Sequence, residues 1–161
     1  MLSLDFGAIW EGYHADSAVT VFVAEPPSAE AEKLVRVTEE ALEAGISQIR
    51  PGGRLSDISH AVQQVVEGAG FSVVREYVGH GIGRSLHEDP QIPNYGLPGR
   101  GPELRPGLVV AVEPMVTMGD WKTRVLADDW TVVTADRSLA AHFEHTIAVT
   151  EDGREVLTAR G

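Results

Sequence analysis

The sequence predicts an α+β fold, in which two amphipathic helices pack on a sheet of short strands. Three observations support this prediction. Residues 2–9 and 17–23 are rich in β-branched and apolar side chains, as in paired strands. Between residues 28 and 70 apolar side chains recur every three or four positions, which is typical of helices with one buried face. Beyond residue 70 the apolar runs are short again, so further strands are expected there.

The first half of the chain has clear boundary signals. Glu11 and Gly12 are expected to form a tight turn that joins the two opening strands into a hairpin. Ser28 is a suitable N-cap for a first helix, which the Pro-Gly-Gly run at residues 51–53 ends. A second helix is predicted from about residue 56 to residue 69, with a glycine stop after it.

The second half is predicted to contain short strands and one long loop. A strand at 71–78 leads into the histidine-containing stretch EYVGHGIGRSLHEDP, and proline-rich residues 91–107 read as an ordered loop. Further strands are predicted at residues 108–112, 131–134 and 143–150, with a short last strand around residues 156 and 157.

Length and composition limit the possible functions. With 161 residues, of which 43% are hydrophobic, the chain suffices for one globular domain, residues 1–161. A net charge of -11 disfavours nucleic acid and anionic membranes as partners. The absence of cysteine excludes disulfides, thiolate metal sites and a cysteine nucleophile. No window approaches the roughly 20 apolar residues of a membrane span, so we expect a soluble, cytoplasmic protein.

Two histidines in the stretch at residues 76–90 are candidate site residues. His80 is flanked by Gly79, Gly81 and Gly83, and glycines permit positive φ and a close approach to a ligand. We therefore expect His80 where a strand ends and a turn begins, a frequent place for site residues. Taken alone, His80 is more often a structural residue than a ligand. His87 follows seven positions later.

Four acidic residues lie in or next to apolar strands. Asp5 falls inside the first strand, Asp16 at the start of the second, Glu113 at the end of the strand at 108–112, and Glu144 inside the strand at 143–150. An acid in such a place is costly unless it is paired, hydrogen-bonded or bound to a cation. By itself Asp5 could equally face outward, and Asp16 could simply cap a turn.

A common site explains these four acids and His80 better than five unrelated placements. The four carboxylates carry a charge of about -4, which two divalent cations would balance. Oxygen ligands with one imidazole suit Mn, Fe, Co or Zn. Paired ions of this kind activate a water molecule and polarise a carbonyl or phosphoryl oxygen.

The chain resembles type I methionine aminopeptidases over nearly its whole length. The resemblance rests on the order of these five residues and on four blocks, LDFGAIWEGYHADSA, EYVGHGIGRSLHEDPQIPNYG, RPGLVVAVEPMV and FEHTIAVTEDG. It implies the pita-bread fold and removal of the initiator methionine from new polypeptides whose second residue is small. Related peptidases that act on Xaa-Pro bonds share the ligand types, but the blocks are closer to the methionine branch.

The resemblance also implies a role for each metal ligand. Asp5 would bind one of two divalent ions (Co, Mn, Fe or Zn) and His80 the other, with Asp16 and Glu144 bridging them. Glu113 would bind the His80-side ion and carry the proton of the attacking water.

Three further residues are implied to contact the substrate, the N-terminal methionine of a polypeptide. His87 would hydrogen-bond the scissile peptide and stabilise the tetrahedral intermediate. Trp130 would line the methionine pocket, although a core position is an equal alternative. Leu86 stands where the family usually has an aromatic residue. Family members work on nascent chains near the ribosome.

The chain departs from the family at its start, because only four residues precede Asp5. We therefore expect an N-terminally truncated, incomplete domain that is weakly active or inactive and less stable than a full-length relative. Its uncovered sheet edge would favour self-association. A peptidase of the same fold that acts on Xaa-Pro bonds and a non-catalytic binding module remain alternatives.

Overall fold

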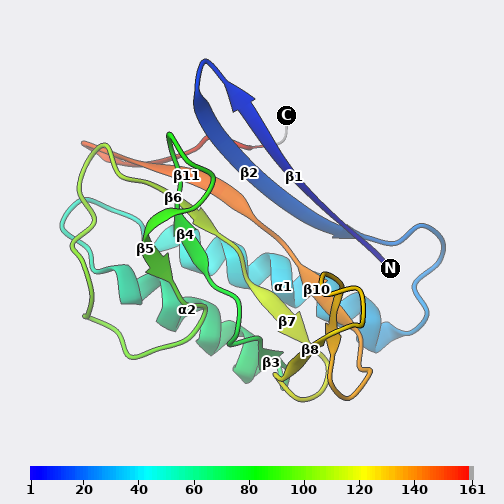
Figure 1. Cartoon of the computed structure of the whole chain (residues 1–161). Helices are drawn as coiled ribbons and strands as arrows, with labels where there is room; N and C mark the ends of the chain where they lie inside the picture. Colours follow the sequence, from blue (N-terminus) through cyan, green and yellow to red (C-terminus); the bar gives the residue numbers. More distant parts are fainter. Residues whose placement is uncertain (160–161) are drawn as a thin grey trace.

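A computed structural model describes residues 1–159 and has the α+β architecture predicted from the sequence. Figure 1 shows two long helices lying side by side along one face of the central strands, with a long N-terminal hairpin beside β11. In chain order the elements are β1 (Leu2–Trp10), β2 (Tyr13–Val21), α1 (Ala29–Ser47), α2 (Leu55–Gly68), β3 (Ser72–Val73), β4 (Gly79–Gly81), β5 (Glu88–Ile92), β6 (Val109–Val112), β7 (Met115–Thr117), β8 (Thr123–Val125), β9 (Val132–Thr134), β10 (Ala140–His142), β11 (His145–Thr150) and β12 (Gly153–Val156).

The strands form antiparallel sheets that meet around one point. A five-stranded sheet has the order β12-β11-β6-β4-β5, a three-stranded sheet has the order β10-β7-β3, and β1-β2 and β8-β9 are hairpins. A bridge between Ala18 and Glu144 joins the first hairpin to the segment between β10 and β11. The middle of β2 therefore lies beside the segment between β10 and β11, which is far from it in sequence.

The helices begin and end where their sequence signals predict. The Ser28 hydroxyl accepts a hydrogen bond from the Ala31 N–H at the start of α1. After α2, Gly70 adopts a left-handed φ of 88°, which glycine tolerates best. Neither helix in residues 1–159 is long and apolar enough to cross a bilayer.

The apolar faces of the helices cover both larger sheets. One core cluster lies against the five-stranded sheet and comprises Leu42, Ile46, Ile49, Leu55, Ile58, Ile92, Leu104, Val110, Val112, Phe143, Ile147 and Val149. The second lies against the three-stranded sheet and comprises Leu34, Val37, Ala41, Val62, Val66, Phe71, Val73, Val116 and Ala141. Burial of these side chains, at about 25 cal/mol per Å² of apolar surface, fixes the strands that carry the candidate site.

Two predicted strand boundaries are wrong in ways that affect the site. The second strand begins at Tyr13, directly after a tight turn in which Glu11 and Gly12 have φ of 49° and 80°. Asp16 is therefore inside β2 and not at its start. The strand predicted at 143–150 begins only at His145, as β11, and Glu144 lies in the break between β10 and β11.

Two further segments, the strand predicted at 71–78 and the loop predicted at 91–107, have a structure that differs from the prediction. Only residues 72 and 73 form a strand in the first segment. The first two residues of the predicted loop, 91 and 92, belong to β5, which pairs with β4. The loop starts after them. The short strands β7, β8 and β10 have too few residues for a period-2 pattern to reveal them.

The glycines around His80 do not form the turn predicted from the sequence. Gly79 and Gly81 belong to β4, an inner strand between β5 and β6, and neither has a left-handed φ. Their role is close packing: a Cβ on Gly81 would collide with the Asp89 carbonyl oxygen, and a Cβ on Gly79 with the Ala111 carbonyl oxygen. His80 is consequently held in mid-strand by backbones on both sides.

This packing predicts the effect of a single methyl group. Gly81→Ala should destabilise the fold by about 1–3 kcal/mol, because neighbouring backbone must shift to admit the Cβ. Gly68→Ala, at the end of α2 with no atom within 4 Å of the new Cβ, should be neutral or stabilising by about 0.5–1 kcal/mol. Urea unfolding midpoints measure both changes. A midpoint for Gly81→Ala equal to that of the unmodified chain would refute the close-packing role.

Candidate metal centre

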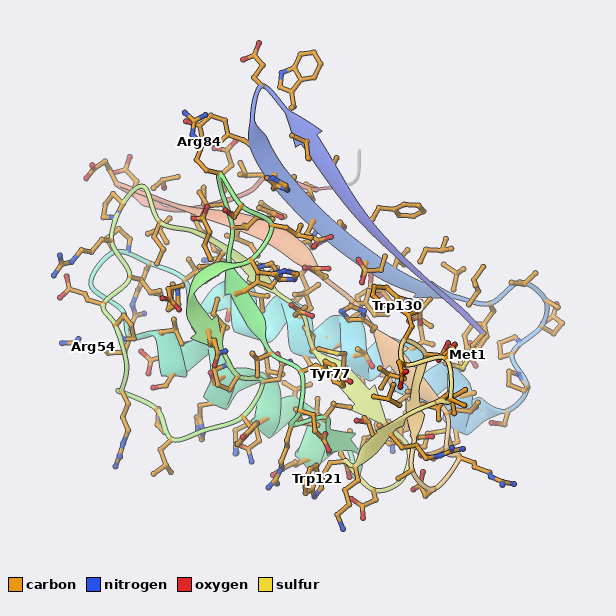
Figure 2. All side chains as sticks on the ribbon, viewed as in Figure 1. Met1, Arg54, Tyr77, Arg84, Trp121 and Trp130 are labelled. Carbon is orange, nitrogen blue, oxygen red and sulfur yellow. The ribbon has the colours of Figure 1, made fainter. Side chains whose placement is uncertain are left out.

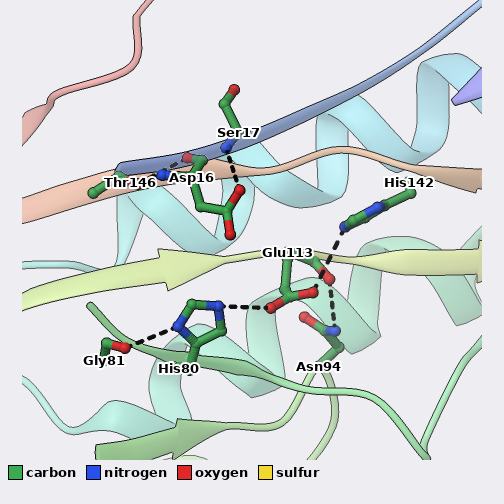
Figure 3. Close-up of polar contacts among 8 residues, drawn as sticks. All are labelled: Asp16, Ser17, His80, Gly81, Asn94, Glu113, His142 and Thr146. Atoms are coloured by element: carbon green, nitrogen blue, oxygen red, sulfur yellow. Dashed lines mark hydrogen bonds and ion pairs between the residues drawn. The ribbon is translucent and has the colours of Figure 1, made fainter. Parts of the chain in front are cut away.

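The five predicted ligands come from five segments that converge on one region. Asp5 lies on β1, Asp16 on β2, His80 on β4, Glu113 directly after β6, and Glu144 between β10 and β11. Figure 3 shows that the Asp16, His80 and Glu113 side chains point into the same space between these strands.

Three of them form a compact group. One possible ligand atom from each of Asp16, His80 and Glu144 lies within 4.8 Å of the other two, the one such group found among residues 1–159. Their exposed fractions are 8%, 6% and 2%. The Oε1 atom of Glu144 is buried without a hydrogen-bond partner. A buried carboxylate oxygen of this kind is costly unless a cation or proton compensates it, so the group fits a metal ion.

The strands hold this group through the backbone and one buried hydroxyl. The Asp16 N–H donates to Thr146 Oγ1 over 2.9 Å, and that hydroxyl donates to the Asp16 carbonyl oxygen over 2.8 Å. Ala18 and Glu144 exchange backbone hydrogen bonds of 3.3 and 3.0 Å. Because β2 and the segment around Glu144 are tied together twice, the two carboxylates are fixed side by side; Figure 3 shows the contact of Asp16 with Thr146.

His80 has the tautomer that a metal ligand needs. Its Nδ1 lies 2.8 Å from the Gly81 carbonyl oxygen, and a carbonyl can only accept a hydrogen bond. Nδ1 therefore carries the proton, and in the neutral ring Nε2 offers its lone pair to the site. A backbone partner that fixes the other ring nitrogen is a common feature of metal-binding histidines.

Glu113 lies between two imidazoles. Its Oε1 is 3.5 Å from His80 Nε2, and its Oε2 is 3.7 Å from His142 Nε2. The Asn94 amide donates to the Glu113 backbone carbonyl over 3.0 Å. The carboxylate, 14% exposed, is thus placed beside the three-residue group without belonging to it.

Asp5 contributes charge to the site from a more exposed position. It pairs with Ala18 across the hairpin, two positions along from the Gly7–Asp16 pair, so Asp5 and Asp16 share one face of the hairpin. Asp5 is exposed. Its negative charge is the second cause, after burial, that raises the pKa of Asp16.

Burial and mutual repulsion keep these acids from ionising easily. Burial, followed by the charges of Asp5 and Asp16, raises the pKa of Glu113 to about 8. Burial, followed by the charges of Glu113, Asp16 and Asp5, raises the pKa of Glu144 to about 9. Nearby positive charge would reverse both effects, so the electrostatics of the site also fit divalent cations.

The three residues predicted to contact the substrate differ in their position relative to the candidate site. The His87 ring stands edge-on to that of His80, with 4.4 Å between ring centroids. Leu86 lies near Gly7, opposite Asp16. Trp130 lies in the turn between β8 and β9 and is 87% exposed (Figure 2). It is not in the core, so that alternative is wrong, and a contact of Trp130 with the substrate stays a prediction.

Two cavities lie beside the site. One of about 810 Å³ has Asp5, Glu113 and His142 at one end and is otherwise lined mainly by apolar side chains, among them Val74, Met115 and Leu126. A second of about 440 Å³ is lined by His80, His87 and the β5 residues Glu88, Asp89 and Gln91.

Sequence reasoning missed three residues that support the site: Asn94, His142 and Thr146. His142 had a usable signal, because it lies two positions before Glu144 and extended residues two apart share a face. Thr146 lies two positions after Glu144 and shows the same spacing. Asn94 gave no signal, because its contact with Glu113 depends on the tertiary fold.

The sequence of this chain is similar to that of known metallopeptidases. The model of metallopeptidase family M24 matches residues 1–151. Methionine aminopeptidase 1 of Bacillus subtilis is 57% identical over 158 residues, which cover 98% of this chain and 63% of that protein. A methionine aminopeptidase of Clostridium perfringens is 53% identical over the same shares. The chain thus spans less than two thirds of the length of these relatives.

Solved structures confirm the pita-bread fold class predicted from the sequence. The crystal structure of methionine aminopeptidase from Thermotoga maritima superposes with a TM-score of 0.95 at 56% identity, over 98% of this chain and 63% of that one. The prolidase from Pyrococcus horikoshii superposes with a TM-score of 0.73 at 22% identity, over 99% of this chain and 40% of that one. At that identity the prolidase shows a shared fold only.

The raised pKa values predict how stability depends on pH. Glu144 has a pKa of about 9 in the fold and about 4.5 when unfolded, so between these values the folded chain holds a proton that the unfolded chain releases. The free energy of unfolding of metal-free protein should therefore fall with rising pH, by on the order of 1 kcal/mol per pH unit for such a group.

Glu144→Gln removes this titration. Without metal, the variant should be more stable than the unmodified chain at pH 8 and about equal to it at pH 5, as measured by urea unfolding. Glu39→Gln, at an exposed position on α1, is the control and should follow the unmodified chain. Identical pH profiles for Glu144→Gln and the unmodified chain would show that Glu144 is not held protonated.

Proposed function

The chain belongs to metallopeptidase family M24, and on that premise we propose that it carries the metal-dependent catalytic site of a methionine aminopeptidase. Its proposed substrate is the N-terminal methionine of a polypeptide. The observation that carries the proposal is the buried group of Asp16, His80 and Glu144 beside Glu113, in a chain 57% identical to a methionine aminopeptidase.

The proposed cofactor is a pair of divalent ions, chosen from Co, Mn, Fe and Zn. Oxygen donors with one imidazole suit these metals, and the unpartnered oxygen of Glu144 supports a cation there. Asp16 and Glu144 would bridge the ions, with Asp5 on one side and His80 and Glu113 on the other. When bound, such ions activate water and polarise a carbonyl group.

The protein's own residues would supply the remaining chemistry. Glu113 would take a proton from the attacking water and pass it to the leaving amine, because its carboxylate lies beside His80 and a general base must be within hydrogen-bond reach of the proton that it takes. His87 would donate a hydrogen bond to the scissile peptide from the far side of His80. The apolar cavity beyond Glu113 would hold the methionine side chain.

Location and partners are part of the same proposal. We place the protein in the cytoplasm, acting on new polypeptides near the ribosome. Self-association through β1 is supported by its pairing with β2 alone among the described strands. Apolar side chains on this hairpin, including Phe6 and Trp10, are 65% and 79% exposed, and such an edge readily pairs with another chain.

Metal binding should stabilise the fold. At a Mn²⁺ concentration about 100 times the dissociation constant, linkage adds about 2.7 kcal/mol, which raises Tm by roughly 5–10 °C for a chain of this size. EDTA should reverse the shift, Asp16→Asn should abolish it, and Glu39→Gln should retain it. A thermal denaturation curve unmoved by Mn²⁺, Co²⁺, Fe²⁺ or Zn²⁺ would exclude the proposed metal centre.

Substrate choice tests the peptidase itself. With Mn²⁺ the chain should release methionine from a Met-Ala-Ser peptide in preference to cleaving an Xaa-Pro peptide. Because its cavity is open to solvent, we expect slower release than by the Bacillus subtilis relative, which serves as positive control. His87→Ala should lower kcat by roughly 100-fold or more while the Mn²⁺-dependent Tm shift persists.

His60→Ala, at a half-buried position on α2 that lines neither cavity, is the matched control for His87→Ala and should leave kcat unchanged. Faster cleavage of the Xaa-Pro peptide would favour a prolidase-like enzyme. Stoichiometric metal without cleavage of either peptide would favour a non-catalytic binding module and would contradict the proposed activity.

A further inference from the structure

His142 is a buried histidine that the roles described so far leave unused. It lies at the end of β10, and its side chain is 17% exposed. Its Nε2 atom is buried and has no hydrogen-bond partner within residues 1–159. A buried polar atom without a partner costs stability, so this histidine has a requirement other than folding of the metal-free chain.

The ring points at a specific atom. Figure 3 shows the Glu113 carboxylate between the two imidazoles of His80 and His142. His80 Nε2 lies 3.5 Å from Oε1, and His142 Nε2 lies 3.7 Å from Oε2. The two oxygens of Glu113 are thus divided between a proposed metal ligand and a histidine with no other polar partner at that nitrogen.

The backbone holds His142 in this place. The Thr20 hydroxyl donates to the His142 carbonyl oxygen over 2.9 Å, and the His142 N–H lies 2.9 Å from the same hydroxyl oxygen as its acceptor. Ser3 Oγ lies 2.8 Å from Thr20 Oγ1. These hydrogen bonds tie β10, which carries the His142 ring, to both strands of the first hairpin.

We propose that His142 is a positioning residue for Glu113: its Nε2–H donates to Glu113 Oε2 and keeps Oε1 turned toward the His80 side of the metal centre. At 3.7 Å the contact is longer than a good hydrogen bond, and catalytic contacts often tighten when a ligand binds. An ionised carboxylate only accepts hydrogen bonds, which assigns the proton to Nε2. The inference rests on the proposed metal centre.

The experiment compares Mn²⁺ affinity with the stability of the metal-free fold. Outer partners of metal ligands typically contribute 10–100-fold in affinity, so His142→Leu should weaken Mn²⁺ binding, measured by titration calorimetry, by about tenfold or more. Metal-free Tm should change by less than about 2 °C, because leucine fills a similar volume and removes an unpartnered polar atom. His142→Gln should keep the affinity within roughly threefold, since its amide N–H can replace the donor.

His60→Leu is the matched control. His60 Nδ1 lies 3.1 Å from the Gly96 carbonyl oxygen, so this substitution removes a structural hydrogen bond of a half-buried histidine. It should leave Mn²⁺ affinity unchanged, whatever it does to Tm.

Each remaining outcome decides between the two proposals. An unmodified chain that binds no Mn²⁺ overturns the metal centre and this inference with it. An unmodified chain that binds Mn²⁺, with His142→Leu binding equally well, overturns the positioning role alone. The positioning role is also overturned if His142→Gln is as weak as His142→Leu, or if His142→Leu lowers metal-free Tm and affinity together, as a structural residue would.

Discussion

The concentration of buried carboxyl groups in one small space is the constraint on which this structure depends. Asp16, Glu113 and Glu144 come from three different segments, and burial raises the pKa of each. Bringing them together costs free energy that the rest of the fold must supply. The two apolar clusters and the antiparallel pairing supply it, and positive charge at the centre would return part of it.

Backbone contacts hold the strands that carry these carboxyl groups in place. β4 is squeezed between two strands whose carbonyl oxygens occupy the space that Cβ atoms of Gly79 and Gly81 would need. The hairpin is pinned at Ala18, Asp16 and Thr20 to the chain around Glu144. Side chains held by anchored strands lose little further entropy on binding a ligand, which suits a preorganised site.

Sequence reasoning succeeded where the signal is local. The Ser28 cap, the Gly70 stop and the opening hairpin depend on neighbours along the chain, and the structure shows each of them. The glycines beside His80 were misjudged because the atoms they make room for belong to Asp89 and Ala111, which local sequence does not reveal.

The placement of single site residues was predictable to different degrees. Acids within apolar runs, such as Asp16 and Glu144, stand out in a sequence because they contradict the pattern around them. Within the break between β10 and β11, Glu144 forms a bridge with Ala18, a long-range contact that the local sequence does not reveal. His142 was missed, and the core alternative for Trp130 was wrong, because only tertiary structure decides whether a ring faces a carboxylate or solvent.

Fold and substrate choice are separate properties of this molecule. The prolidase from Pyrococcus horikoshii shares the fold at a TM-score of 0.73 and 22% identity, so strand order does not select the substrate. In the proposed function the carboxylates and His80 would hold the metal ions, but they have no feature that recognises a side chain. The proposal therefore assigns recognition to the apolar cavity past Glu113, whose walls include Val74, Met115 and Leu126. An unbranched apolar side chain such as that of the proposed methionine would match these apolar walls.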